Sequence, residues 1–139
     1  MKILIIDGQG GGIGRQLVEA LKQAGERDIT CVGTNAIATS AMLRAGATRA
    51  ATGENAVAVA CREAEAIAGP VGIVIADALL GEVTPRMAAA VGQSRARKVL
   101  IPVNQCGNFV VGVPAGASTA QLVALAVEAI LRPEVDTKS

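Results

Sequence analysis

The sequence predicts a three-layer α/β fold with a mainly parallel sheet. Short apolar runs alternate with helical patterns from one end of the 139 residues to the other, and this alternation is typical of βαβ units. A glycine cluster joins the first apolar run to the first helical pattern. The length fits one domain. We therefore expect a single domain at residues 1–131, followed by a frayed polar tail at residues 132–139.

The first half of the chain alternates between strand and helix patterns. A continuous apolar run predicts a strand at Lys2–Ile6 that is buried on both faces. After the glycines, Ile13, Leu17 and Leu21 recur at helical spacing, which predicts an amphipathic helix. The other elements expected here are a strand at Asp28–Gly33, a helix at Ala36–Ala45 closed by Gly46, a short strand at Thr48–Thr52 and an alanine-rich helix at Glu54–Ala68.

The second half begins with the apolar run Val71–Ala76, which predicts another buried strand. Pro85 after Thr84 indicates the start of a helix that runs to about Ser94. The other elements expected here are two strands, Lys98–Val103 and Asn108–Val113, and a last helix that begins with a capping box at Ser118 and Gln121 and ends near Leu131. Only a few polar residues separate the two strands, so their spacing is compatible with an antiparallel hairpin near the C-terminal edge of the sheet.

The composition excludes several kinds of chemistry. The chain has no His, Trp or Tyr and a single aromatic residue, Phe109. It therefore has no His-containing catalytic triad, no His-ligated zinc site and no stacking platform for single-stranded nucleic acid. Its 13 basic and 12 acidic residues give a net charge of +1, which is too small to attract nucleic acid or an anionic membrane. We expect neither partner.

The three cysteines, Cys31, Cys61 and Cys106, lie far apart and form no CxxC pair. This pattern argues against a disulfide framework and against a thiolate metal site, so we expect reduced thiols and no metal. The first apolar run is too short for a signal peptide, and Asp77 interrupts the longest later one. These features predict a cytoplasmic protein.

The strongest functional signal is the segment Gly8-Gln9-Gly10-Gly11-Gly12-Ile13-Gly14, between the first strand and the first helix. Glycines let backbone N–H groups approach a phosphate without an intervening Cβ, and the helix adds the positive end of its dipole. The spacing fits GxxxGxG at Gly8, Gly12 and Gly14, and it fits neither GxGxxG nor GxxxxGK[ST]. We expect these seven residues to bind a nucleotide. The alternative is a tight structural turn that holds no ligand.

This loop, with its Gly-Ile-Gly ending, resembles the nucleotide loop of short-chain dehydrogenases. The resemblance stops there, because the Tyr-x-x-x-Lys catalytic pair of that family has no counterpart in a chain without Tyr. Over roughly residues 2–113 the chain resembles a short bacterial family known as a domain of unknown function. The matching stretches are IDGQGGGIG, GTNAIATSAMLRAGAT, ATGENAV, GPVGIVIADALLGEVTP and LIPVNQC. This resemblance implies a stand-alone Rossmann-like domain from a bacterium, and it implies no activity.

Thr34 and Asn35 follow the second expected strand, at the end of the sheet where ligands of such folds bind. NAD-binding proteins usually have Asp or Glu there, and NADP-binding proteins often have Arg. Neither is present at this position. Asn35 either bonds a ribose hydroxyl or caps the next helix. NAD and NADP are the first cofactors we consider, and another nucleotide or phosphate ester remains open.

Three further residues are candidates for catalysis. Asp77 follows a predicted strand, with Glu82 in the loop beyond it. Asp77 either binds a hydroxyl, acts as a base with a pKa raised by burial, or holds loop amides. Asn104 and Cys106 follow the Lys98–Val103 strand, and the Cys106 thiol is either activated there or inert.

Asp7, beside the glycines, is expected to bond their backbone amides or to contact ribose, because its charge would repel a phosphate.

Three functions follow from these residues. The first is a small nucleotide-binding protein, for an NAD(P)-type dinucleotide, that acts as a sensor or accessory subunit. The second is a small enzyme that acts on a phosphorylated or nucleotide metabolite, using Asp77 with Cys106 or Asn104. The third is a partner-binding module whose glycine turn holds no ligand. We also expect a homodimer, because a bare Asn108–Val113 edge strand carrying Phe109 would need a cover.

Overall fold

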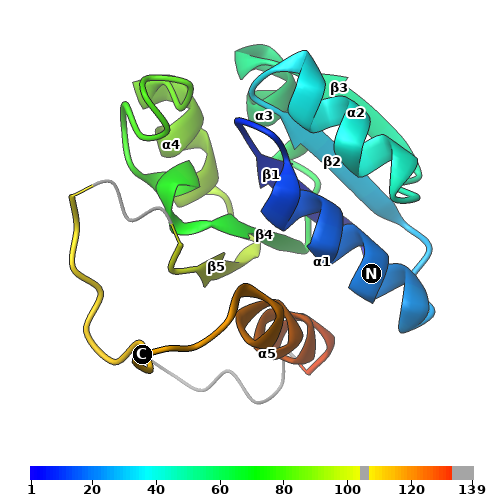
Figure 1. Cartoon of the computed structure of the whole chain (residues 1–139). Helices are drawn as coiled ribbons and strands as arrows, with labels where there is room; N and C mark the ends of the chain where they lie inside the picture. The colour runs from blue at the N-terminus through cyan, green and yellow to red at the C-terminus, as the bar shows by residue number, and fades with distance from the viewer. Residues whose placement is uncertain (104–106, 133–139) are drawn as a thin grey trace.

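Five parallel strands form the central layer of the molecule, in the order β3-β2-β1-β4-β5 (Figure 1). The computed structural model describes residues 1–103 and 107–132. The strands are β1 (Ile3–Asp7), β2 (Ile29–Gly33), β3 (Arg49–Thr52), β4 (Ala66–Pro70) and β5 (Arg97–Ile101). β1 pairs with β2 on one side and with β4 on the other. This strand order is that of a Rossmann-like fold, so the predicted α/β class with a parallel sheet is confirmed.

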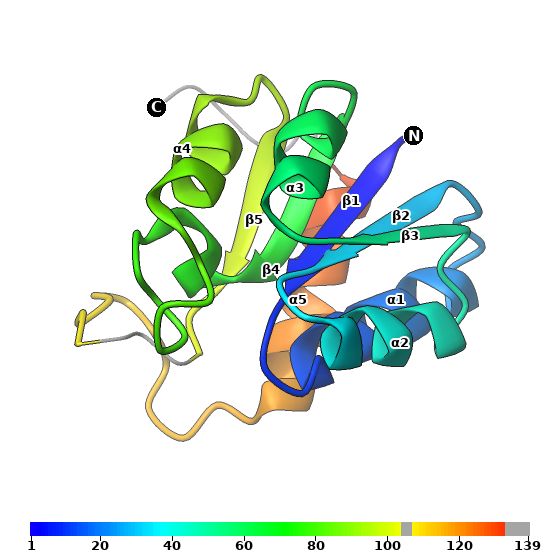
Figure 2. The same ribbon diagram turned by 90° about the horizontal axis from the view of Figure 1, so that it is seen from above.

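Helices cover both faces of the sheet (Figure 2). The helices α1 (Gly12–Gln23), α2 (Ala36–Arg44) and α5 (Thr119–Leu131) lie on one face, and α3 (Glu54–Ala60) and α4 (Pro85–Gln93) lie on the other. In β1, Ile3 and Ile5 belong to the core beneath the first group of helices. Leu4 and Ile6 belong to the core beneath the second group. A strand buried on both faces needs a continuous apolar run, which explains the sequence of β1.

Three predicted helix starts are confirmed by their caps. The side chains of Asn35, Thr84 and Ser118 each accept a hydrogen bond from a backbone amide three residues later. Ser118 and Gln121 form the expected capping box. Gly46 has a φ of 117° and follows the end of α2, as predicted for a helix-closing glycine. Local capping chemistry therefore sets these boundaries.

Residues 54–76 differ from the prediction. The helix predicted at Glu54–Ala68 begins at Glu54 as expected but is shorter than predicted, and the strand predicted at Val71–Ala76 is wrong. Helix α3 ends at Ala60, the strand β4 occupies Ala66–Pro70, and residues 71–74 form a short 3₁₀ helix, η1 (Val71–Val74).

The physical reason is the pairing of β4 with β1. Ala66 and Ala68 pair with Ile3 and Ile5, and their small side chains lie in the core beneath α1 and α5. A Cβ on Gly69 would lie 2.2 Å from the carbonyl oxygen of Ile6, so this strand requires a glycine there. These long-range contacts outweigh the local preference of alanine for helix.

The predicted Asn108–Val113 strand is also wrong, and with it the hairpin. Residues 108–113 form no strand. Gly107 and Gly112 have φ values of 82° and 93°, which turn the chain out of an extended conformation. Phe109 and Val111 are 88% and 86% exposed. Within the described ranges, no helix is long and apolar enough to cross a membrane.

Candidate functional site

The glycine loop connects β1 to α1 at the carboxyl end of the sheet. From β1 the chain passes to β2 and β3 on one side, and from β3 it crosses back to β4 on the other side of β1. Folds of this class bind ligands at such a switch point. At three of the five glycines, a larger residue would clash with neighbouring atoms, as the distances from an added Cβ show.

A Cβ on Gly8 would lie 2.5 Å from Thr34 Oγ1, and one on Gly14 would lie 2.4 Å from Met42 Sδ. Gly11 has a φ of 75°, and its Cβ would lie 2.9 Å from the backbone of Ala38. Close packing against the second strand and helix therefore requires these three glycines.

At Gly10 and Gly12, neither packing nor backbone conformation requires glycine. Neither has a positive φ, and an added Cβ on either would meet no atom within 4 Å. Both residues are exposed, and among the described residues their backbone amides have no acceptor. Gly12 is the first residue of α1, so its amide belongs to the positive end of the helix dipole. The fold has room for a Cβ at these two positions.

Asp7 holds the inner side of the loop together. It is 5% exposed, and its carboxylate accepts hydrogen bonds of 2.7 Å from the amides of Gly8 and Gly14. Burial raises the pKa of Asp7 by more than these hydrogen bonds lower it, and the nearby charge of Glu82 raises it further. The expected bonds from Asp7 to the glycine turn are thus present. The inward-facing amides are satisfied by the protein itself.

Glu82 contacts the outer side of the loop. Its Oε1 atom accepts three hydrogen bonds, from the Gln9 amide at 2.8 Å, the Thr34 hydroxyl at 2.7 Å and the Asn35 side-chain amide at 2.8 Å. Partial burial raises the pKa of Glu82, but these three hydrogen bonds lower it by more, so the pKa lies below its ordinary value. A carboxylate therefore does lie at the end of β2, although it comes from another loop.

Asn35 caps α2, which is one of the two roles predicted for it. Its Oδ1 accepts from the amide of Ala38 at 2.9 Å and so caps α2. Its Nδ2 donates to the carbonyl of Gln9 at 3.0 Å as well as to Glu82. The glycine loop, the end of β2 and the segment before α4 are therefore joined by one side chain.

The remaining predicted residues do not gather at this site. Asp77 does not end a strand. It is exposed, has a φ of 68°, and forms loop hydrogen bonds through its backbone. The idea of a buried base at Asp77 is therefore wrong. Ile13 is half-buried in the first turn of α1. Asn104 and Cys106 lie outside the described residues.

The cysteines Cys31 and Cys61 are buried, and burial raises the pKa of each thiol to about 11. Within the described residues, no group of three or more acidic, Cys or His residues could hold a metal ion.

Glu82 is the residue that sequence reasoning missed. The sequence offered one signal. Thr34 and Asn35 follow β2 where an acidic residue is usual, and a carboxylate from another segment could take that place. The Gln9–Glu82 contact spans 73 residues, so spacing in the sequence could not indicate it.

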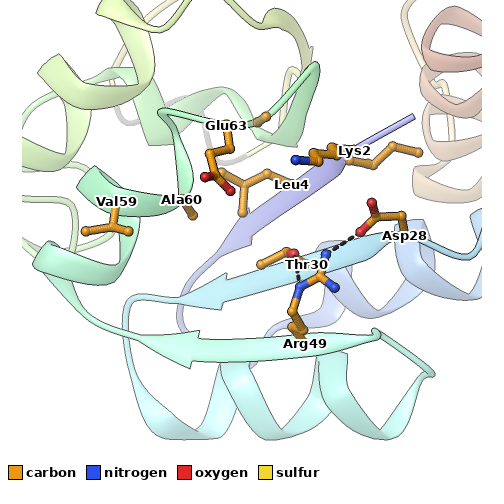
Figure 3. Close-up of a pocket in the computed structure, with 10 residues that line it drawn as sticks. Lys2, Leu4, Asp28, Thr30, Arg49, Val59, Ala60 and Glu63 are labelled. Atoms are coloured by element: carbon orange, nitrogen blue, oxygen red, sulfur yellow. Dashed lines mark hydrogen bonds and ion pairs between the residues drawn. The ribbon is translucent and has the colours of Figure 1, made fainter.

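A separate cavity of about 420 Å³ lies at the opposite, amino end of the strands (Figure 3). Arg49 forms an ion pair with Asp28 and donates to Thr30 Oγ1 at 3.2 Å on one side of it. Lys2 and Glu63 line the other side. Its charges are of both signs, and none of its lining residues belongs to the glycine loop.

The comparisons with known proteins found a family and similar solved structures. Comparison with the curated proteins found no match. Among solved structures, the chain is similar to a nucleoside-diphosphate-sugar epimerase from Pseudomonas aeruginosa, with 16% sequence identity and a TM-score of 0.49. The similarity covers 96% of this chain and 48% of the epimerase, so the chain spans about half of that protein's length. Residues 2–134 match the family described as a domain of unknown function (DUF3842). Because this match covers nearly the whole chain, the protein belongs to the DUF3842 family.

Proposed function

We propose that the protein binds a nucleotide at the carboxyl ends of β1 and β2, with a phosphate group against the amides of Gly10 and Gly12. One observation carries this proposal. These two glycines are exposed, have ordinary φ values and leave open space where a Cβ would be. Since neither backbone conformation nor packing requires glycine there, the close approach of a ligand is the remaining physical reason for it.

The electrostatics of the loop are compatible with a phosphate. The buried carboxylate of Asp7 is turned inward, where the amides of Gly8 and Gly14 bind it. The amides of Gly10 and Gly12 have no acceptor in the described part of the chain, and they add to the positive end of α1. An NAD-type dinucleotide is the ligand that we place first, because this fold binds such ligands across the switch point next to β1.

We further propose that the protein acts as a sensor or accessory subunit. Both carboxylates at the loop, Asp7 and Glu82, are already bound by amides and hydroxyls of the protein. Groups held in this way position a ligand better than they transfer protons. This role rests on the arrangement of these two residues.

The test is a ligand panel on the purified protein. Thermal unfolding is measured with NAD⁺, NADP⁺, 5′-AMP, ATP, CoA and inorganic phosphate, and calorimetric titration follows for each compound that shifts the midpoint. A ligand present at 100 times its Kd should stabilise the fold by about 2.7 kcal/mol. If no compound shifts the midpoint and mass spectrometry finds no co-purified nucleotide, the proposal is refuted and the partner-binding module is favoured.

A further inference from the structure

We propose that Glu82 is the ribose-recognition residue of this site and that it selects nucleotides whose 2′-hydroxyl is free over those that carry a 2′-phosphate. The inference rests on the proposed nucleotide binding and adds the class of ligand. In folds of this kind the residue that contacts the ribose usually follows β2, whereas Glu82 lies in the segment before α4.

The position of the carboxylate supports this assignment. Thr34 and Asn35 directly follow β2, at the place where an acidic residue of a dinucleotide-binding protein contacts the ribose. Both side chains donate to Glu82 Oε1, at 2.7 and 2.8 Å. The Gln9 amide donates to the same atom at 2.8 Å. Glu82 therefore lies where the glycine loop meets the end of β2.

The two oxygens of Glu82 have different surroundings. Oε1 accepts all three of these hydrogen bonds, whereas Oε2 has no partner among the described residues. A free carboxylate oxygen accepts from hydroxyl donors, and a ribose with free 2′- and 3′-hydroxyls supplies two of them. A 2′-phosphate would place a second negative group against the same carboxylate. None of the groups bound to Glu82 is cationic, so nothing there offsets the repulsion.

The loop that carries Glu82 is well anchored. Leu79 and Val83, on either side of Glu82, are 4% and 1% exposed. The amide of Asp77 donates to the carbonyl of Val83 at 2.7 Å, and the amide of Val83 donates to the carbonyl of Ala78 at 3.1 Å. The carboxylate is therefore held in place before any ligand arrives, as selective recognition requires.

This loop also contains backbone strain. Asp77, Leu79 and Leu80 have φ values of 68°, 57° and 56°. Side chains other than glycine rarely adopt this conformation, and such strain concentrates at functional sites. Gly8 lets the loop approach, because a Cβ there would lie 2.8 Å from both Glu82 Oε1 and Leu79 Cδ1. The glycine loop and the Glu82 loop thus fit each other.

The experiment compares two probes that differ only in the 2′-phosphate: 5′-AMP and adenosine 2′,5′-bisphosphate. NAD⁺ and NADP⁺ form a second pair with the same difference. Calorimetric titrations are run on the wild type, on Glu82→Gln, and on Glu63→Gln as a matched control. Glu63 is an exposed glutamate at the far end of the sheet, beside the other cavity. Ligand-free thermal unfolding checks that each variant folds.

We expect the wild type and Glu63→Gln to bind the 2′-hydroxyl probes roughly tenfold or more tightly than the 2′-phosphate probes. In Glu82→Gln this ratio should fall toward one, because the amide neither repels the phosphate nor binds hydroxyls with a charge. Equal affinity for both members of a pair in the wild type refutes the inference and leaves nucleotide binding intact. Tighter binding of all probes by Glu82→Gln also refutes it, and would show that Glu82 blocks the site. If no probe binds the wild type, this inference fails, and nucleotide binding fails with it when the other compounds of the ligand panel also leave the midpoint unchanged.

Discussion

Substitution of Gly12 by alanine separates a ligand-binding loop from a purely structural turn. Gly12 is the first residue of α1, and its added Cβ meets no atom within 4 Å. The folded state should therefore accept the methyl group without strain. Since alanine restricts the unfolded chain and favours helix, the free energy of unfolding should stay the same or rise by about 0.4–1 kcal/mol.

The same substitution at Gly14 should have the opposite effect on stability. The new Cβ would lie 2.4 Å from Met42 Sδ and 2.9 Å from the Cβ of Asp7, against 3.4–4 Å for an ordinary contact. Buried neighbours would have to move by about 1 Å, and overpacking of this kind costs about 1–3 kcal/mol. The two variants thus differ in the sign of their effect on stability, although each adds one methyl group to the same loop.

Ligand binding gives the decisive measurement for Gly12→Ala. A methyl group on the exposed face of the first turn would stand where the phosphate approaches, so the affinity for NAD⁺ should fall by roughly tenfold or more. Gly92→Ala is the matched control, because Gly92 is an exposed glycine in α4 whose Cβ would also meet no atom. It should leave the affinity unchanged.

The assays are calorimetric titration with NAD⁺ and urea denaturation followed by circular dichroism, since the chain has no Trp or Tyr to report by fluorescence. If Gly12→Ala retains the wild-type affinity, the ligand does not approach the first turn of α1. A loss of more than about 1 kcal/mol of stability would show instead that the fold itself requires Gly12.

Three further predictions concern other parts of the chain. In Asp7→Asn, the side-chain NH₂ group would face the backbone amide of Gly8 or Gly14, so two donors would meet. The free energy of unfolding should therefore fall by roughly 2–4 kcal/mol. An unchanged urea midpoint would contradict this. Burial raises the pKa of Asp7 above its ordinary 3.8. The contribution of Asp7 to the free energy of unfolding should therefore be largest below about pH 4 and should decline as the pH rises through the folded-state pKa. Urea denaturation of the wild type and of Asp7→Asn at several pH values measures this decline. The thiols of Cys31 and Cys61, with pKa values of about 11, should react with Ellman's reagent only after denaturation, and fast reaction of all thiols in the native state would be inconsistent with their burial. The predicted homodimer loses its edge strand, and the exposed side chain of Phe109 is now its only ground. If a second copy covers Phe109, sedimentation at micromolar concentration should show a dimer that Phe109→Ser weakens, and a monomeric wild type would remove this proposal.

Local chemistry made several elements predictable. A cap is formed by groups within three residues of each other, so Asn35, Thr84 and Ser118 mark their helices in the sequence itself. β1 is also predictable from its own residues, because a strand buried on both faces has a continuous apolar sequence. The error at Ala66–Pro70 concerns a segment whose local preference and long-range contacts disagree. Ala66–Pro70 is alanine-containing and continues a helical pattern, but pairing with β1 makes it a strand.

In the candidate site, too, some features could be predicted from the sequence and others depend on contacts between distant segments. The sequence by itself determined that a glycine-rich segment lies between a buried strand and a helix, because chain connectivity fixes that order. Only the tertiary structure decided which glycines the packing requires and which it leaves free, since this depends on neighbours such as Met42 and Ala38. It also decided that Glu82, which is 73 residues from its partner Gln9, places a carboxylate at the end of β2, where the sequence has no acid. Hydrogen bonds between distant segments depend on how the loops meet in space, and spacing along the chain does not encode that meeting.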